Sequence, residues 1–199
     1  MHISEGILSG SMLITGWAGS VAGLAVGLKK TDMNKITRTA LLSSGFFLAS
    51  LVNIKVGASS THLSFLAPMG LILGWGVFPA VFVALLLQAL LFHFGGLLVL
   101  GANNFIMSIS SLSVYILFGK VIRDSRNKLL VMSLAFISGA LAVIIAAFLV
   151  GAFLTLSDSN FMNAAKLIVI AHVPLALIEG LVTSFMISWL KKSAPEFLL

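Results

Sequence analysis

The first two residues of the chain could bind a metal ion through nitrogen. Met1 supplies a terminal amine, and His2 supplies a ring nitrogen together with a main-chain nitrogen that can lose its proton. These three donors would close small fused chelate rings, and a nitrogen from His62 would complete a plane. Square-planar nitrogen coordination suits Ni(II) or Cu(II), and Co(II) can be accommodated. A histidine in second position is by itself a weak signal, because any chain can begin this way.

A set of hydrogen-bonding side chains is expected to hold the two metal-binding segments in place. A site built from a chain end and a distant loop needs both parts pinned, because ordering them would otherwise consume the binding energy. For Asn103 the alternative is a plain role as the N-cap of a helix. The candidates for this supporting role are Glu5, Ser59, Ser60, Thr61, Asn103 and Asn104.

Three other polar side chains lie within or beside apolar stretches. His172 and Glu179 are separated by two helical turns and therefore share one face of a helix. Ionisable groups inside a membrane are costly and face the bundle interior. This pair either forms a structural hydrogen-bonded link between helices or takes part in function. His93 stands before a Gly-Gly turn, and we interpret it as an interfacial aromatic residue.

The elements that must position these residues are membrane helices. The chain has 199 residues, of which 59% are hydrophobic and 9% charged, with a mean hydropathy of +1.14. This composition predicts an all-α, polytopic membrane bundle that forms a single domain over residues 1–199. The third apolar stretch is short and interrupted by Pro and Gly, so we expect a broken or partial span and keep six helices as the alternative to seven. The seven stretches are 6–28, 37–56, 63–75, 77–94, 104–119, 129–153 and 162–190.

The basic residues predict the orientation of this bundle. With seven spans, ten of the twelve Lys and Arg residues fall on one side, and only Lys55 and Lys166 fall on the other. Positive charge collects on the cytoplasmic side, so the N-terminus is expected outside and the C-terminus inside. The net charge of +6 then reflects topology and contact with the lipid bilayer, and we expect no nucleic acid as a partner. The absence of cysteine excludes disulfides and thiolate ligands.

Five sequence blocks together resemble the CbiM/NikM family, the substrate-binding membrane subunits of cobalt and nickel energy-coupling-factor (ECF) transporters. The blocks are "MHISEGILS", "GASSTHLS", "QALLFHFGG", "LGANNFIMS" and "AHVPLALIEGLVT", and the similarity runs from Met1 to about Thr183. The resemblance implies that Met1, His2 and His62 carry Ni(II) or Co(II) as the transported substrate. Departures occur at Ile3-Ser4, after His62 and at His93, and they bear on which metal is preferred.

The resemblance also implies partners and a location. A transmembrane coupling subunit and two ATPase subunits would supply energy, with a small accessory membrane subunit in some assemblies. The location would be the cell (inner) membrane of a bacterium or archaeon, in a system that serves cobalamin biosynthesis or nickel uptake. Small residues could let partner helices approach closely, although packing within the chain is the simpler interpretation for the glycines. These residues are Gly19, Gly23 and Gly27, together with Ala40 and Ser44.

Two other functions remain open. The chain could act alone as an ion-coupled metal carrier, with His172 and Glu179 as a proton relay. It could also be an intramembrane metallohydrolase using the same two residues, although the sequence has no His-Glu-x-x-His motif. No Gly-x-x-x-x-Gly-Lys-Ser/Thr loop is present either, so we expect no ATPase activity and no enzyme.

Overall fold

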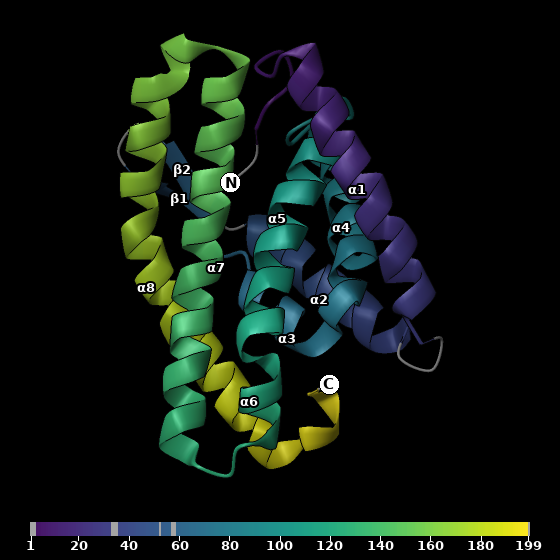
Figure 1. Cartoon of the computed structure of the whole chain (residues 1–199), viewed down its shortest axis with the longest axis vertical. Helices are drawn as coiled ribbons and strands as arrows, with labels where there is room; N and C mark the ends of the chain where they lie inside the picture. The colour runs from purple at the N-terminus through teal and green to yellow at the C-terminus, as the bar shows by residue number, and fades with distance from the viewer. Residues whose placement is uncertain (1–2, 33–35, 52, 57–58, 199) are drawn as a thin grey trace.

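The computed structural model describes residues 3–32, 36–51, 53–56 and 59–198, with only the main chain described for 53–56 and 59–61. The described chain is a bundle of helices interrupted by one short β-hairpin (Figure 1). Its elements are α1 (Gly10–Lys30), α2 (Ile36–Leu51), β1 (Asn53–Val56), β2 (Ser59–His62), α3 (Leu66–Leu73), α4 (Val77–Phe92), α5 (Leu100–Val114), α6 (Lys120–Asp124), α7 (Lys128–Ser157) and α8 (Met162–Ser193). Short 3-10 or π-helical turns join several of them. The all-α membrane fold predicted from composition is confirmed.

Contacts along α1 show how the first half of the bundle is arranged. Trp17 packs edge-on against Phe82 of α4, with 6.3 Å between ring centroids. One helical turn from the end of α1, Gly27 lies against the main chain of Trp75 and the ring of Pro79. Helices α1 and α4 are therefore antiparallel. Near the start of α1, Gly16 lies against Ala102, the third residue of α5, so α5 runs parallel to α1.

The second half of the bundle is a long hairpin of α7 and α8, on the left of Figure 1. The two helices touch where Gly139 meets the main chain of Glu179 and Gly180, so no side chain separates them there. The Ser184 hydroxyl donates to the carbonyl of Met132 at 2.9 Å, which adds a polar link further along. Small residues allow this close backbone approach between membrane helices.

The second expected span is shorter in the structure than in the sequence prediction. The stretch 37–56 was expected to be helical throughout, but α2 ends at Leu51 and Asn53–Val56 forms a strand. This correction has a physical reason, because Asn53 and Lys55 are poor residues for a lipid-facing helix and strand pairing satisfies their main chain. The strands pair antiparallel, with Asn53 opposite His62. At 1.5 Å per residue, the 16 residues of α2 rise only about 24 Å.

The third stretch is a partial span, as its Pro and Gly residues suggested. Helix α3 has 8 residues, all of them buried, and the chain turns back at Gly74–Gly76, where Gly74 has a φ of +54°. By length and composition alone, five stretches of the described chain could cross a membrane, namely Gly10–Lys30, Leu66–Phe92, Leu100–Asp124, Lys128–Ser157 and Ser159–Ser193, and the second of these contains the turn at Gly74–Gly76. The shorter α2 is a sixth apolar helix. Seven complete crossings are therefore not confirmed.

Basic residues gather at the end of the bundle where α1 and α8 finish. Lys30 lies over the ring of Trp75, with 5.1 Å from its ammonium to the ring centroid. Arg38 donates to the carbonyl of Glu196 at 2.8 Å. Lys191 bonds the main chain at the end of α6, through the carbonyls of Ile122, Arg123 and Ser125. We call this region the basic end and the opposite one the Gly10 end.

The glycine row of α1 serves packing within the chain. A side chain at Gly19 would overlap Phe105 of α5, and one at Gly23 would overlap Phe78 of α4. Ala40 and Ser44 of α2 behave differently, because both are exposed and line an open apolar groove. The glycines are therefore covered by this chain, whereas the small residues of α2 are not.

Candidate metal site

His62 is the one expected metal ligand whose side chain the structure describes. It ends β2 and is only 3% exposed. Its Nδ1 donates to the carbonyl of Leu63 at 3.0 Å, because a carbonyl can only accept. This bond selects the tautomer in which Nε2 carries the lone pair, which is the form a metal ligand needs. Burial lowers the pKa of His62 to about 3, so the ring is neutral over the physiological range.

Asn103 holds the main chain of Ile3 with two hydrogen bonds. The amide N–H of Ile3 donates to Asn103 Oδ1 at 3.0 Å, and Asn103 Nδ2 donates to the carbonyl of Ile3 at 3.0 Å. Ile3 itself is 3% exposed and belongs to the hydrophobic core. Because Ile3 follows His2 directly, the Asn103 amide fixes the chain one residue away from the expected chelating nitrogens.

Glu5 fastens the same terminal segment to the loop between α4 and α5. Its amide N–H donates to the carbonyl of Gly95 at 3.0 Å, and its Oε1 accepts from the amide of Leu98 at 2.9 Å. The indole of Trp17 donates to the carbonyl of Leu98 at 2.9 Å, which joins α1 to the same loop. Residues 3–5 are thus held at two points, Asn103 and this loop.

Asn104 differs from its neighbour in what it binds. Its Nδ2 donates to the hydroxyl of Ser20 on α1 at 2.7 Å, and its Oδ1 accepts from Ser108 at 3.1 Å. These contacts join α1 to α5 without touching the terminal segment. The N-cap alternative for Asn103 is also not what is seen, because α5 already begins at Leu100.

Several expected site residues fall outside the described part of the chain. Met1 and His2 are not described at all. Ser59, Ser60 and Thr61 pair through their main chain with β1, but their side chains are not described. Among the described residues there is no cluster of three or more His, Cys, Asp or Glu side chains that could hold a metal.

Glu179 lies deep in the bundle and binds the start of α3. Its Oε1 accepts from the amide of Ser64, from the Ser64 hydroxyl at 3.0 Å and from the amide of Phe65 at 3.2 Å. Amide groups at a helix start have no partner within the helix, and a carboxylate there is favourable. Ser64 was missed as a partner in the sequence, because 115 residues separate it from Glu179.

His172 is not hydrogen-bonded to Glu179 in the described structure. Its Nδ1 donates to the carbonyl of Ile168, one turn earlier in α8, at 2.7 Å. Its Nε2 is buried and has no hydrogen-bond partner among the described residues. The expected polar pair is therefore two separate groups on one helix face, and Glu179 makes the link between helices alone.

His93 lies outside this site. It follows the last residue of α4, has a left-handed φ of +55° and is exposed, beside Gly95 and Gly96. This position agrees with a residue beside a Gly-Gly turn, and the role of His93 as an interfacial aromatic residue stays a prediction.

The comparisons with known proteins identify the family. The profile described as "Cobalt uptake substrate-specific transmembrane region" matches residues 2–197. The chain belongs to this CbiM family. A relative from Haemophilus influenzae, named for metal transport, is 34% identical, and the alignment covers 98% of this chain and 96% of the relative. The cobalt transport protein CbiM of Kyrpidia tusciae is 29% identical over 100% of this chain and 86% of its own length.

Other relatives widen the range of metals and confirm the fold. The fused nickel transport protein NikMN of Rhodobacter capsulatus is 28% identical, and the chain matches 64% of that longer protein. A crystal structure of a truncated transition metal transporter superimposes with a TM-score of 0.84 at 25% identity, covering 96% of this chain and 99% of the other. This CbiM-family chain is therefore a membrane component of cobalt or nickel transport.

Proposed function

We propose that the chain is the substrate-binding subunit of an ATP-driven ECF importer for Ni(II) or Co(II). It captures the ion at its outer side through the amine of Met1, the main-chain and ring nitrogens of His2, and His62. The ion is then delivered inward across the cell membrane. The observation that carries this proposal is the pair of hydrogen bonds between Asn103 and Ile3. They restrain the chain directly after His2, so less ordering entropy is lost when the metal binds.

The state of His62 supports the same ligand set. A buried, neutral imidazole with its Nδ1 proton engaged by Leu63 has a fixed tautomer and a fixed ring orientation. Nitrogen donors of this kind suit Ni(II), and Co(II) can occupy the same site. The names of relatives include both metals, so we propose either ion as substrate.

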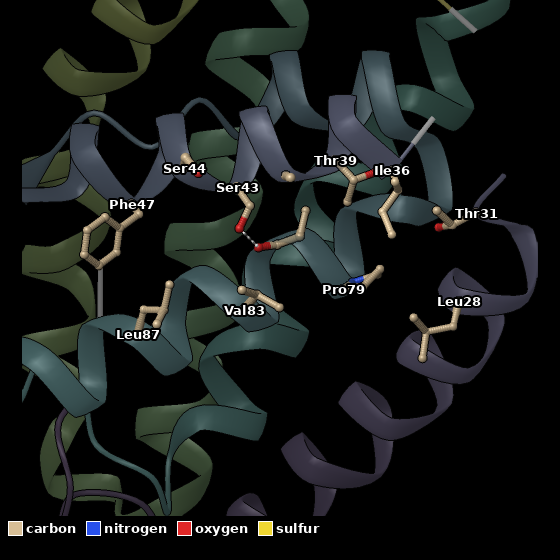
Figure 2. A pocket seen from close by; sticks show the side chains of 12 residues that line it. Leu28, Thr31, Ile36, Thr39, Ser43, Ser44, Phe47, Pro79, Val83 and Leu87 are labelled. Carbon is tan, nitrogen blue, oxygen red and sulfur yellow. Dashed lines mark hydrogen bonds between the residues drawn. The ribbon is translucent and has the colours of Figure 1, made fainter. Parts of the chain in front are cut away.

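Energy would come from other subunits, namely a transmembrane coupling subunit and two ATPase subunits, with a small accessory membrane subunit in some assemblies. The exposed groove on α2 is the surface that we assign to such a helical partner. It has a volume of about 380 Å³ and is bounded by Ala40, Phe47, Val83 and Leu87 (Figure 2). Small side chains beside a groove permit close helix packing in a membrane.

The decisive experiment places one glutamine between Met1 and His2, because a bulky residue after Met1 prevents the removal of Met1 during synthesis. The insertion moves the amine away from the His2 nitrogens and enlarges a chelate ring, so we expect Ni(II) and Co(II) affinity to fall by at least an order of magnitude. Isothermal titration of the purified protein measures this. A glutamine added after Leu199 is the matched control and should leave affinity unchanged. Tight binding by the protein with the insertion would exclude the amine as a ligand.

A second experiment tests the energy source. ATP-dependent metal uptake is expected from vesicles that hold the complete assembly and not from vesicles that hold this chain alone. The competing function, an ion-coupled carrier with Glu179 and His172 as proton relay, predicts uptake by the single chain driven by a proton gradient. The intramembrane metallohydrolase receives no support from the described site, where Glu179 is engaged at the start of α3.

A further inference from the structure

A cavity of about 330 Å³ lies at the basic end, between the start of α7 and the end of α8. Its polar lining consists of Ser125, Arg126, Lys128, Ser188, Lys191 and Lys192. Four of these residues are cationic, and none of the lining residues is acidic. We call this cavity the basic pocket. Its volume falls at the lower end of the range for small-molecule sites.

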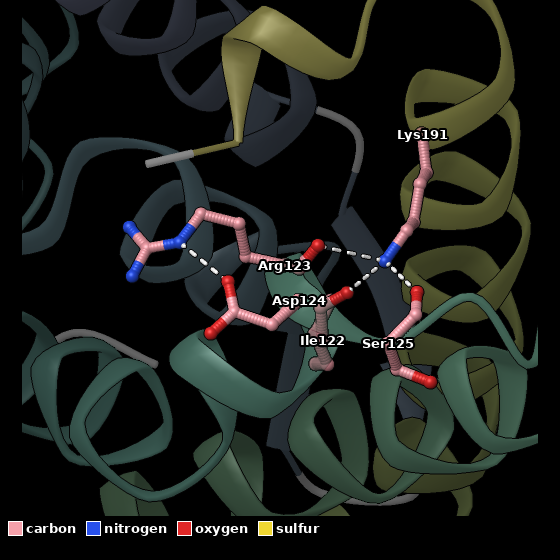
Figure 3. Close-up of polar contacts among 5 residues, drawn as sticks. All are labelled: Ile122, Arg123, Asp124, Ser125 and Lys191. Carbon is pink, nitrogen blue, oxygen red and sulfur yellow. Dashed lines mark hydrogen bonds and ion pairs between the residues drawn. The ribbon is translucent and has the colours of Figure 1, made fainter.

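Lys191 forms the rigid wall of the basic pocket. Its ammonium donates to the carbonyls of Ile122, Arg123 and Ser125, as Figure 3 shows. An ammonium has three donors, so its hydrogen-bonding capacity is used by the main chain while its charge remains. The side chain of Asp124 turns away from Lys191 and binds Arg123 at 3.4 Å. The nearest carboxylate is thus engaged on the other side of the α6–α7 turn.

The other polar groups of the basic pocket are available to a ligand. Arg126, Lys128 and Lys192 are exposed. The hydroxyl of Ser188 is buried and has no hydrogen-bond partner among the described residues. Lys128 is also the first residue of α7, a helix of 30 residues whose N-terminal dipole adds positive potential. Three cations, a helix start and an unused hydroxyl form an environment for an anion with several acceptor oxygens, such as a phosphate group.

The surface beside the basic pocket favours a lipid as the source of that phosphate. Leu129, Phe185 and Trp189 are 73%, 75% and 59% exposed, and along α7 and α8 they are next to, or within one turn of, the pocket residues Lys128 and Ser188. Large apolar side chains exposed next to a cluster of cations mark the border between acyl chains and headgroups. Basic pockets between membrane helices are known settings for anionic headgroups.

We propose that the basic pocket binds the phosphate headgroup of an anionic phospholipid, whose acyl chains lie on Leu129, Phe185 and Trp189. Arg126, Lys128 and Lys192 neutralise the phosphate, and Ser188 donates its hydroxyl proton to a phosphate oxygen. The bound lipid bridges the α6–α7 turn and the end of α8, which Lys191 already joins. This site is independent of the metal site.

Native mass spectrometry of the full-length protein, titrated with phosphatidylglycerol or phosphatidylcholine, tests the proposal. We expect one phosphatidylglycerol to bind in preference to phosphatidylcholine. In the Arg126→Gln/Lys192→Gln variant this affinity should fall roughly tenfold or more, since each basic residue near an anionic headgroup contributes about fivefold. The matched control is Lys29→Gln/Lys120→Gln, which removes two exposed charges at the same end but outside the pocket, and it should keep the wild-type affinity.

Further measurements test whether the bound phosphate group belongs to a lipid and whether Ser188 binds it. Ser188→Ala should weaken phosphatidylglycerol binding roughly tenfold or more, about what one hydrogen bond to a charged group contributes. Excess inorganic phosphate should not displace the lipid. Displacement would contradict the proposal that the natural ligand is a lipid and would indicate a soluble phosphate compound instead. If both double variants lost the same amount of phosphatidylglycerol affinity, binding would depend on the overall positive charge of this end, and the pocket would be excluded as a specific site. The pocket would also be excluded as the binding site if Ser188→Ala and Arg126→Gln/Lys192→Gln, measured as two separate variants, both bound phosphatidylglycerol as tightly as wild type.

Discussion

Two adjacent asparagines differ in function because they point at different elements. Asn103 binds both main-chain groups of Ile3, whereas Asn104 binds Ser20 of α1. Successive residues of a helix are about 100° apart, so neighbours with the same side chain reach different surroundings. The pair therefore offers a controlled test of what the contact with Ile3 contributes to metal binding.

We predict that Asn103→Ala lowers Ni(II) affinity by roughly 10–100-fold, as the loss of groups that orient metal ligands does. The loss should be smaller than in His62→Ala, which removes a donor. Asn104→Ala should keep affinity near the wild-type value, although it loses the bond to Ser20 and some stability. Isothermal titration and thermal unfolding of both variants separate the two effects. Equal affinity losses in Asn103→Ala and Asn104→Ala would contradict this assignment.

The buried imidazole of His62 should make the apoprotein acid-sensitive. Burial lowers its pKa to about 3 in the folded chain, against about 6.5 when unfolded. Between these values the unfolded chain binds the proton more readily, so the free energy of unfolding falls as pH is lowered from about 6.5 toward 3. We expect wild type to lose more stability than His62→Gln between pH 7.5 and pH 5, measured by thermal unfolding without metal. Parallel losses would show that His62 does not titrate in this way.

At the scale of elements, the short helix α3 begins inside the bundle and depends on α8. Its 8 residues are buried, and the amides of the two residues directly before it, Ser64 and Phe65, donate to the carboxylate of Glu179. A buried amide without a partner costs roughly 1–3 kcal/mol. The carboxylate of Glu179 therefore secures the start of α3 and, through Ser64, the segment that joins α3 to the end of β2, where His62 lies.

We predict that Glu179→Ala destabilises the protein by roughly 2–4 kcal/mol, because it leaves the amides of Ser64 and Phe65 without an acceptor. Glu179→Gln keeps one acceptor oxygen and should lose less stability and retain metal uptake by the assembly. A proton relay would behave differently, since a glutamine cannot carry a proton through its cycle. Uptake abolished in Glu179→Gln, with its stability intact, would favour the relay.

The glycines on α1 and α2 lead to opposite predictions for one substitution. A side chain at Gly23 would overlap the ring of Phe78, whereas a Cβ added at Gly45 would meet no described atom within 4 Å. Gly23→Ala should therefore destabilise the protein by roughly 1–3 kcal/mol. Gly45→Ala should be neutral or stabilising by up to about 1 kcal/mol, because alanine is the better helix former. Thermal unfolding in detergent compares them, and a Gly23→Ala variant as stable as Gly45→Ala would refute close packing at that site.

At the scale of the whole molecule, the cluster of basic residues and the segments of the expected metal site lie toward opposite ends of the bundle. The basic end carries the cluster around Lys191 and Lys30, while the terminal segment 3–5 and the loop 95–98 lie toward the Gly10 end. A metal captured near Ile3 and released at the basic end would traverse the bundle along its length. The orientation of these ends in the membrane follows from charge and is open to direct measurement.

We predict that the loop between α7 and α8 faces outward and the loop between α6 and α7 faces the cytoplasm. The chain has no cysteine, so a single introduced cysteine gives an unambiguous signal. Asn160→Cys should react with a membrane-impermeant thiol reagent in intact cells, and Asp124→Cys only after permeabilisation. The reverse pattern would place the basic end outside and overturn the proposed direction of capture.

Composition and local motifs alone determined the membrane class, most of the helical stretches and the partial nature of the third segment, but not the strand at Asn53–Val56. These properties follow from hydropathy, from Pro and Gly within 63–75 and from the placement of Lys and Arg, all of which act locally. The same reasoning proposed His62 and Asn103 as partners of the chain start. The hydrogen bonds of Asn103 to Ile3 agree with this for Asn103, whereas the role of His62 stays a prediction. The family could be identified from five short blocks in order.

Only the tertiary structure decided which polar groups meet. Ile3 and Asn103 are 100 residues apart, and Ser64 and Glu179 are 115 apart. Their pairing depends on how α3, α5 and α8 cross. The sequence likewise placed His172 and Glu179 on one face, but the start of α3 supplies donors to Glu179 that no local pattern reveals. Helical periodicity determines which way a side chain points, whereas the neighbouring element that receives it depends on the packing of the whole bundle.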